Sequence, residues 1–236
     1  MVAIRDPISF GFGVTINDRQ WDLLKASFFR QRPPVAPQPP NWSLEKVPAL
    51  LLAPRFQSDP GPPDLLLRTL FLVAMATGHR VSQLAALLRS PGFTRFGPRD
   101  SSVTLAPRPR FLAKNERAGH RVKPVVIQAW MVDDTHHPLC PVLALKLYLS
   151  TTSNSPGVAL WVDPRSPKPL TTTDLARRLV DVIRLADPQS HPRAHQVRKY
   201  ASSLAFFRCF DVDAVREAGQ WSSPTSFVQI PGPPSV

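Results

Sequence analysis

Residues 65–84 read LLLRTLFLVAMATGHRVSQL, and this stretch decides the fold. Its first part, up to Thr77, is strongly apolar, which is typical of a helix buried on all sides. Gly78 follows and can end that helix in the left-handed conformation. A second helix is expected over residues 81–88, which leaves Arg80 near its N-terminus, where backbone N–H groups and the helix dipole favour an anion. The stretch therefore predicts a core helix followed directly by a candidate anion-binding arginine.

Helical patterns recur on both sides of this stretch. Further helices are expected from the caps Asn41 or Ser43 through Leu51, kinked at Pro48; from Pro141 to Leu149; from the caps Thr172 or Thr173 to Ala186; from His195 to Phe207; and from Asp211 to about Gly219. Between them, residues 103–105, 110–113 and 122–128 are short apolar or alternating runs, which predict strands. The fold class is therefore mainly α with a small antiparallel β-sheet.

Proline marks the domain organisation. Several of the 28 prolines gather between Pro33 and Pro40, which predicts a stiff, extended linker. Residues 1–40 then form an N-terminal piece, in which Asn17 can cap a short helix with an apolar face. Residues 41–236 form the main domain.

Composition narrows the class of protein. With 236 residues, of which 43% are hydrophobic, the chain can bury a core. Its 29 Lys and Arg against 17 Asp and Glu give a net charge of +12, which attracts polyanions. Charge alone does not separate nucleic acid from an anionic membrane surface or from a merely basic protein.

The chain is expected to be intracellular and not a membrane protein. The longest apolar run, Leu70 to Ala76, is too short to cross a bilayer. Arg5 and Asp6 are followed by a glycine-broken stretch rather than by the apolar run of a secretory leader. The chain has 2 cysteines, which favours a reducing compartment over a disulfide framework.

His195 and Arg198 form the second candidate site. They lie three residues apart on an expected helix and so share one face, while Val197 and Ala201 can face the core. Such a pair suits an oxyanion. The pattern is weak alone, because a helix histidine can be satisfied by a backbone carbonyl and an arginine can sit in a surface ion pair.

These residues fall within an ordered set of motifs. The set comprises Asn41-Trp42-Ser43-Leu44, Leu70-Phe71-Leu72, Ala76-Thr77-Gly78-His79-Arg80-Val81-Ser82-Gln83-Leu84, Phe111-Leu112-Ala113-Lys114-Asn115, Leu139-Cys140-Pro141-Val142, His195-Gln196-Val197-Arg198 with Ala201-Ser202-Ser203, and Gly219-Gln220-Trp221-Ser222-Ser223-Pro224 with Phe227. In this order the chain resembles the catalytic domain of the tyrosine recombinase (phage integrase-like) family, and most closely the recombinases of DIRS-like retroelements. Type IB topoisomerases resemble this active site too.

The resemblance assigns roles to five residues. Arg80 and Arg198 would clamp the phosphodiester and neutralise charge on its non-bridging oxygens. Lys114 would be the general acid toward the departing oxygen, His195 would hydrogen-bond the phosphate or shuttle a proton, and Trp221 would donate its indole N–H. The alternatives are an ordinary solvated lysine and a core tryptophan. The basic residues around Lys114 are expected to touch DNA phosphates in either case: Arg108, Arg110, Arg117, Arg121 and Lys123.

Two departures from the family affect its activity. The position of the family's nucleophilic tyrosine falls on Pro231, and the 2 tyrosines, Tyr148 and Tyr200, lie inside earlier expected helices. A chain without that phenol cannot form a phosphotyrosine intermediate, so we predict no strand cleavage. Family members also carry a helical DNA-clamping domain of roughly one hundred residues ahead of the linker. Only residues 1–40 precede Asn41, and from the two departures together we expect a degenerate, truncated or alternatively read copy of a mobile element.

No cofactor or metal is expected. His136, His137 and Cys140 form one short cluster without a second ligand pair at zinc spacing. The sequence has no glycine-rich phosphate loop, HExxH or GxSxG motif. The expected partner is double-stranded DNA, with self-association on it, in the nucleus. Two other functions stay open: a non-catalytic DNA-binding or architectural module, and a helical protein-interaction remnant.

Overall fold

The structure, a computed structural model, describes residues 18–31, 41–112, 123–155 and 157–209. The chain divides into two compact units, Met1–Gln38 and Pro39–Val236. In the first unit the structure contains α2 (Asp18–Gln31), so the helix expected there is confirmed. Asn17, its expected cap, lies outside the described residues.

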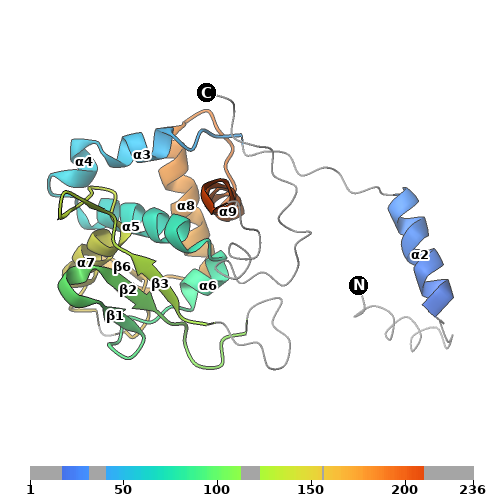
Figure 1. Cartoon of the computed structure of the whole chain (residues 1–236), viewed down its shortest axis with the longest axis horizontal. Coiled ribbons are helices and arrows are strands. Elements are labelled where there is room, and N and C mark those ends of the chain that lie inside the picture. The colour runs from blue at the N-terminus through green and yellow to red at the C-terminus, as the bar shows by residue number, and fades with distance from the viewer. Residues whose placement is uncertain (1–17, 32–40, 113–122, 156, 210–236) are drawn as a thin grey trace. The chain divides into compact units, whose positions relative to one another are not determined.

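The second unit is mainly helical (Figure 1). Its helices are α3 (Lys46–Leu51), α4 (Pro54–Gln57), α5 (Pro62–Thr77), α6 (Val81–Ala85), α7 (Pro141–Thr151), α8 (Thr172–Ala186) and α9 (His195–Cys209), with the 3-10 turn η2 (Pro98–Asp100). Its strands are β1 (Thr94–Phe96), β2 (Ser102–Leu105), β3 (Val125–Gln128), β4 (Met131–Val132), β5 (Thr135–His136), β6 (Val162–Asp163) and β7 (Ser166–Pro169). The helix expected over residues 211–219 lies outside the described part of the chain.

Helix α5 is the centre of this unit, as its sequence predicts. It packs against α7, α8 and α9 and also touches β3. Its buried residues, from Leu65 to Thr77, point in all directions around the helix axis. Gly78 ends it with φ 59°, a left-handed conformation that glycine adopts without strain. The chain therefore turns sharply toward Arg80.

The small antiparallel sheet is confirmed, but one of its strands was predicted in the wrong place. Its order is β1-β2-β3, with Val103 opposite Ile127 and both side chains buried. The expected strand at residues 110–113 does not form over the described positions, because Arg110 has φ 61°, which no strand tolerates. The third strand is instead β1, at residues 94–96. Two further hairpins, β4–β5 and β6–β7, complete the strands described.

The start of α3 differs from the expectation. Helix α3 begins after Glu45, so neither Asn41 nor Ser43 is its cap; the Ser43 N–H donates instead to the Asp187 carboxylate. Pro48 falls in the first turn, where its missing N–H is not needed, and no kink follows.

Helix α6 ends early, at Ala85. The next residues leave the helix because Leu87 and Leu88 pair with Pro107 and Ala159 in isolated bridges. The expected helix over residues 81–88 is therefore shorter than predicted.

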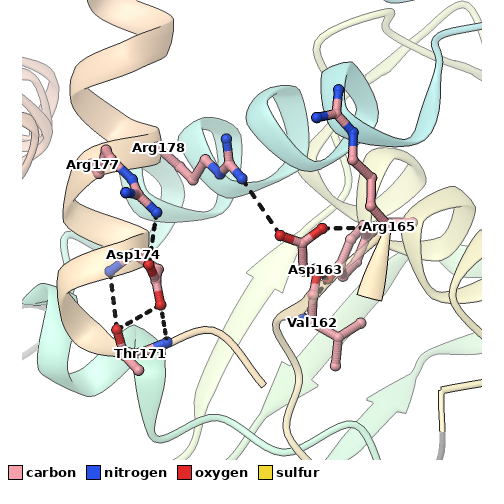
Figure 2. Close-up of polar contacts among 8 residues, drawn as sticks. Val162, Asp163, Arg165, Thr171, Asp174, Arg177 and Arg178 are labelled. Atoms are coloured by element: carbon pink, nitrogen blue, oxygen red, sulfur yellow. Dashed lines mark hydrogen bonds and ion pairs between the residues drawn. The ribbon is translucent and has the colours of Figure 1, made fainter. Parts of the chain in front are cut away.

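The cap of α8 is Thr171, one residue before the expected Thr172 or Thr173. Its hydroxyl accepts from the Asp174 N–H, and the Asp174 carboxylate accepts from the Thr171 N–H (Figure 2). Figure 2 also shows Arg177 donating to Asp174, and Arg178 facing Asp163. The Arg178 Nη2 and the Asp163 Oδ2 form an ion pair at 3.6 Å. These two arginines at the start of α8 therefore face carboxylates.

Candidate functional site

Arg80 is placed by the turn that follows α5. It is the N-cap of α6, with extended backbone angles, and its N–H donates to the Gln83 Oε1 at 2.8 Å. Its side chain is half-buried. Because α6 is a single turn and a half long, its dipole contributes less at Arg80 than the longer expected helix would.

Arg198 reaches the same place from α9. Its Nη1 donates to the Gln83 Oε1 at 3.2 Å, across 115 residues of sequence. The Gln83 side chain is buried, so this contact is shielded from solvent. One amide oxygen thus accepts from the Arg80 backbone and from the Arg198 guanidinium, and the structure brings the two expected phosphate-clamping arginines together.

Helix α9 is held in this orientation by the segment before α3. The Trp42 indole N–H donates to the Gln196 Oε1 at 3.1 Å, and the Tyr200 hydroxyl donates to the Trp42 carbonyl at 2.8 Å. The Trp42 and Tyr200 rings meet edge to face with centroids 4.6 Å apart. Val197 is buried in the core, which leaves Arg198 to face Gln83.

Arg80, Arg198 and His79 form a cluster in which the positive charges repel one another. Burial, and then the nearby Arg80, lower the pKa of Arg198 to about 9, so the guanidinium stays charged at neutral pH. Burial, and then Arg198, lower the pKa of His79 to about 4. Two cations and a buried imidazole therefore lie close together, an arrangement that an anion would stabilise.

His195 is the first residue of α9, one turn before Arg198, and its side chain is exposed. Partial burial, followed by Lys199 and Arg193, lowers its pKa. The structure places it at the same end of α9 as Arg198.

The predicted basic segment is described at its two ends. Arg108, Arg110 and Lys123 are exposed. The Arg108 N–H donates to the Ala86 carbonyl at 2.7 Å, which ties this segment to the end of α6. Four expected site residues lie outside the described part of the chain: Lys114, Arg117, Arg121 and Trp221.

Both tyrosines of the chain have structural partners. The Tyr148 hydroxyl donates to the Val162 carbonyl and accepts from the Val162 N–H, and burial raises its pKa to about 12. The Tyr200 hydroxyl donates to Trp42, and burial raises its pKa as well. Neither phenol is a ready nucleophile. Pro231 lies outside the described residues.

The histidine–cysteine cluster is a local packing arrangement. The His136 Nδ1 lies 3.3 Å from the Cys140 Sγ, whereas the His137 Nδ1 accepts from the Leu139 N–H and its ring stacks on Trp130. Over the residues that the structure describes, no three His, Cys, Asp or Glu side chains gather as a metal site would require. No described helix combines the length and apolar character of a membrane span.

Two residues beside Arg80 and Arg198, namely Gln83 and His79, were not singled out from the sequence. Gln83 lies at the third position of α6, and a glutamine there is a known signal for a bond back to the cap residue's N–H. That signal could have predicted its bond to Arg80, but not to Arg198. No sequence pattern predicted a role for His79, because only the tertiary structure shows that its ring is buried.

No family model matches the chain, and no curated protein matches it in sequence. Solved structures do match. XerH site-specific recombinase, bound to palindromic difH substrate in a post-cleavage complex, superposes with a TM-score of 0.59 at 16% identity, over 81% of this chain and 49% of that one. XerA recombinase gives 0.56 at 19% identity, over 89% and 70%. The fold is that of a tyrosine recombinase catalytic domain.

A further match to this recombinase fold is a lambda integrase(75-356) dimer bound to a COC′ core site, with a TM-score of 0.52 at 15% identity over 96% of this chain and 69% of that one. The chain spans about half the length of the XerH structure that it matches. The expected fold class, mainly helical with small antiparallel sheets, is confirmed. The similarity at this level of identity concerns the fold.

Proposed function

We propose that this chain is an integrase-like domain that binds double-stranded DNA by holding one backbone phosphate between Arg80 and Arg198, and that it does not cut the strand. One observation supports this above all others: the Gln83 Oε1 accepts from the Arg80 backbone at 2.8 Å and from Arg198 at 3.2 Å. This contact joins the backbone at Arg80 and the guanidinium of Arg198 to one side-chain oxygen, and both arginines are half-buried.

The chemistry of the two arginines fits a phosphodiester. A guanidinium presents planar N–H groups that match phosphate oxygens, and two of them can share the charge of one phosphate. Partial removal from water strengthens such contacts. The net charge of +12 favours a polyanion over an isolated small anion. The exposed Arg108, Arg110 and Lys123 can contact neighbouring phosphates.

The structural neighbours support DNA as the partner. XerH is described bound to its difH substrate, and lambda integrase as a dimer on a core site. By the same likeness we propose that copies of this chain associate on DNA. We propose that His195, Lys114 and Trp221 are the other members of the site. We also propose that the chain derives from a DIRS-like retroelement and acts in the nucleus.

The proposed lack of cleavage rests on the tyrosines. Tyr148 and Tyr200 are both engaged in the core by their hydroxyls, and the family's nucleophile position falls on Pro231. We therefore propose that neither of these tyrosines attacks a phosphate held by the two arginines. Binding without covalent attachment follows.

Binding is tested by titrating a fluorescent duplex with the full chain at several salt concentrations. A contact to each phosphate contributes about −0.9 to the slope of log K against log salt. Arg198→Ala is expected to weaken binding about tenfold or more and to reduce that slope by about one. Arg55→Ala is the matched control, because it removes the same charge from an exposed arginine already paired with Asp64. Equal effects of the two substitutions would contradict the phosphate clamp.

Cleavage is tested with Pro231→Tyr on a nicked suicide duplex. A covalent protein–DNA adduct that disappears when Arg198→Ala is added would show that the pocket can still support the family's chemistry. An adduct formed by the unchanged chain would contradict the proposed inactivity. If the chain binds DNA but neither the unchanged chain nor Pro231→Tyr forms an adduct, the result favours an architectural role.

A further inference from the structure

His79 is buried, and its ring makes no hydrogen bond to the residues that the structure describes. The residue is 4% exposed, and neither Nδ1 nor Nε2 has a partner among the residues described. Most buried polar atoms in proteins are satisfied, and each one that is not destabilises the fold, so such a ring calls for an explanation. The other buried unpartnered atoms, on Arg68, Arg89 and Arg178, belong to guanidinium groups that make contacts through their remaining nitrogens.

The position of His79 ties it to the two arginines. It stands between Gly78 and Arg80, in the turn that packs on α9. A Cβ added at Gly78 would lie 3.9 Å from both the Ala201 Cβ and the Ser202 Oγ, and these residues follow Arg198 on the same face of α9. Arg198 also acts electrostatically on His79 and lowers the pKa of its ring, in agreement with this packing of the turn on α9.

The neighbouring polar groups have their own partners. The Thr77 hydroxyl donates to Val73, and the Ser202 hydroxyl donates to the Arg198 carbonyl. The Gln83 amide oxygen already accepts from Arg80 and Arg198. The structure therefore gives the His79 ring no bonding role within the described fold, although it lies beside the proposed phosphate clamp.

We propose that His79 is a third member of this anion site, neutral while the site is empty and protonated when a phosphate binds between Arg80 and Arg198. This inference rests on the proposed function. The proton comes from solvent, and no covalent bond changes. A bound phosphate offsets the charge of Arg198 and offers an acceptor oxygen, so both effects that keep the ring neutral are reduced.

The charges around His79 define the expected pH dependence. Arg198 on α9 acts on it directly, and Arg80 acts on Arg198. Thr77 of α5 and Gln83 of α6 are neutral. His195 at the start of α9 also titrates, but Lys199 and Arg193 are the charges that act on it. A change that belongs to His79 must therefore disappear in a His79 variant and persist in variants of other histidines.

The experiment measures proton uptake when the full chain binds a short duplex, by calorimetry at pH 5.5 in two buffers of different ionisation enthalpy. The unchanged chain is expected to take up close to one proton more than His79→Leu on binding. When the pH falls from 7.5 to 5, its affinity for the duplex is expected to increase by a factor about ten times larger than that of His79→Leu. His191→Gln, which changes an exposed histidine, should behave like the unchanged chain. Equal proton uptake in the unchanged chain and His79→Leu would overturn the inference.

The two proposals fail separately. If the chain binds DNA with a slope that depends on Arg198, but His79→Leu takes up as many protons, only the role of His79 is wrong. If the chain shows no salt-dependent duplex binding at pH 7.5, the phosphate clamp itself is wrong. Should His79→Leu not fold, the ring nitrogens of His79 in the unchanged chain are followed by NMR across pH 4–8. Identical titration with and without duplex would then overturn the inference.

Discussion

His79→Leu should change how the stability of the chain depends on pH. In the folded chain the pKa of His79 is lowered from its ordinary 6.5 to about 4, chiefly by burial. Between those two values the unfolded state binds more protons than the folded state, so folding stability falls as the pH drops through this window and is highest above it. At about 1.4 kcal/mol per pH unit, the loss attributable to His79 is about 3 kcal/mol.

The same substitution should stabilise the chain at neutral pH. Leucine fills a similar volume without two unsatisfied ring nitrogens, and removing such groups is worth about 1–2 kcal/mol. A gain in stability with a loss of anion affinity is the pattern expected of a residue retained for binding.

The assay is urea unfolding at half-unit steps from pH 7.5 to 4.5, comparing the unchanged chain, His79→Leu and His191→Gln. The free energy of unfolding of the unchanged chain and of His191→Gln should fall together toward acid, while that of His79→Leu should fall by much less. His195, whose pKa is also lowered, contributes equally to all three curves. Parallel curves for the unchanged chain and His79→Leu would refute the reasoning, because they would mean that His79 titrates normally in the folded state.

Three further outcomes follow from the contacts. Gln83→Met should keep the fold but lower duplex affinity about tenfold, because Arg198 loses the oxygen that orients it; an unchanged affinity in the fluorescence titration would contradict that role. Tyr148→Phe leaves both backbone groups of Val162 without their partner and should cost about 2–3 kcal/mol of unfolding free energy in urea, with duplex affinity retained. Gly78→Ala should cost about 1 kcal/mol, since alanine is strained at φ 59°; an unshifted denaturation midpoint would show that the turn relaxes.

Much of the fold followed from local sequence rules. The apolar run of α5, its glycine end at Gly78 and the helical patterns of α7, α8 and α9 all predicted elements that the structure contains. Such signals survive because burial and capping act over a few residues. One error arose where distant partners prevailed, and another where the backbone took a conformation that the pattern does not show. Residues 87 and 88 leave α6 to pair with other segments, and the left-handed Arg110 displaces an expected strand.

The sequence by itself determined which side chains could bind a phosphate: Arg80 after the core helix, and Arg198 on a later amphipathic one. Only the tertiary structure decided that they meet, through Gln83, and that the His79 ring is buried with no hydrogen-bond partner in the described part of the chain. The reason is physical. The charge and shape of a guanidinium belong to the residue, whereas its partners, its burial and the pKa of its neighbours depend on segments more than a hundred residues apart packing against each other.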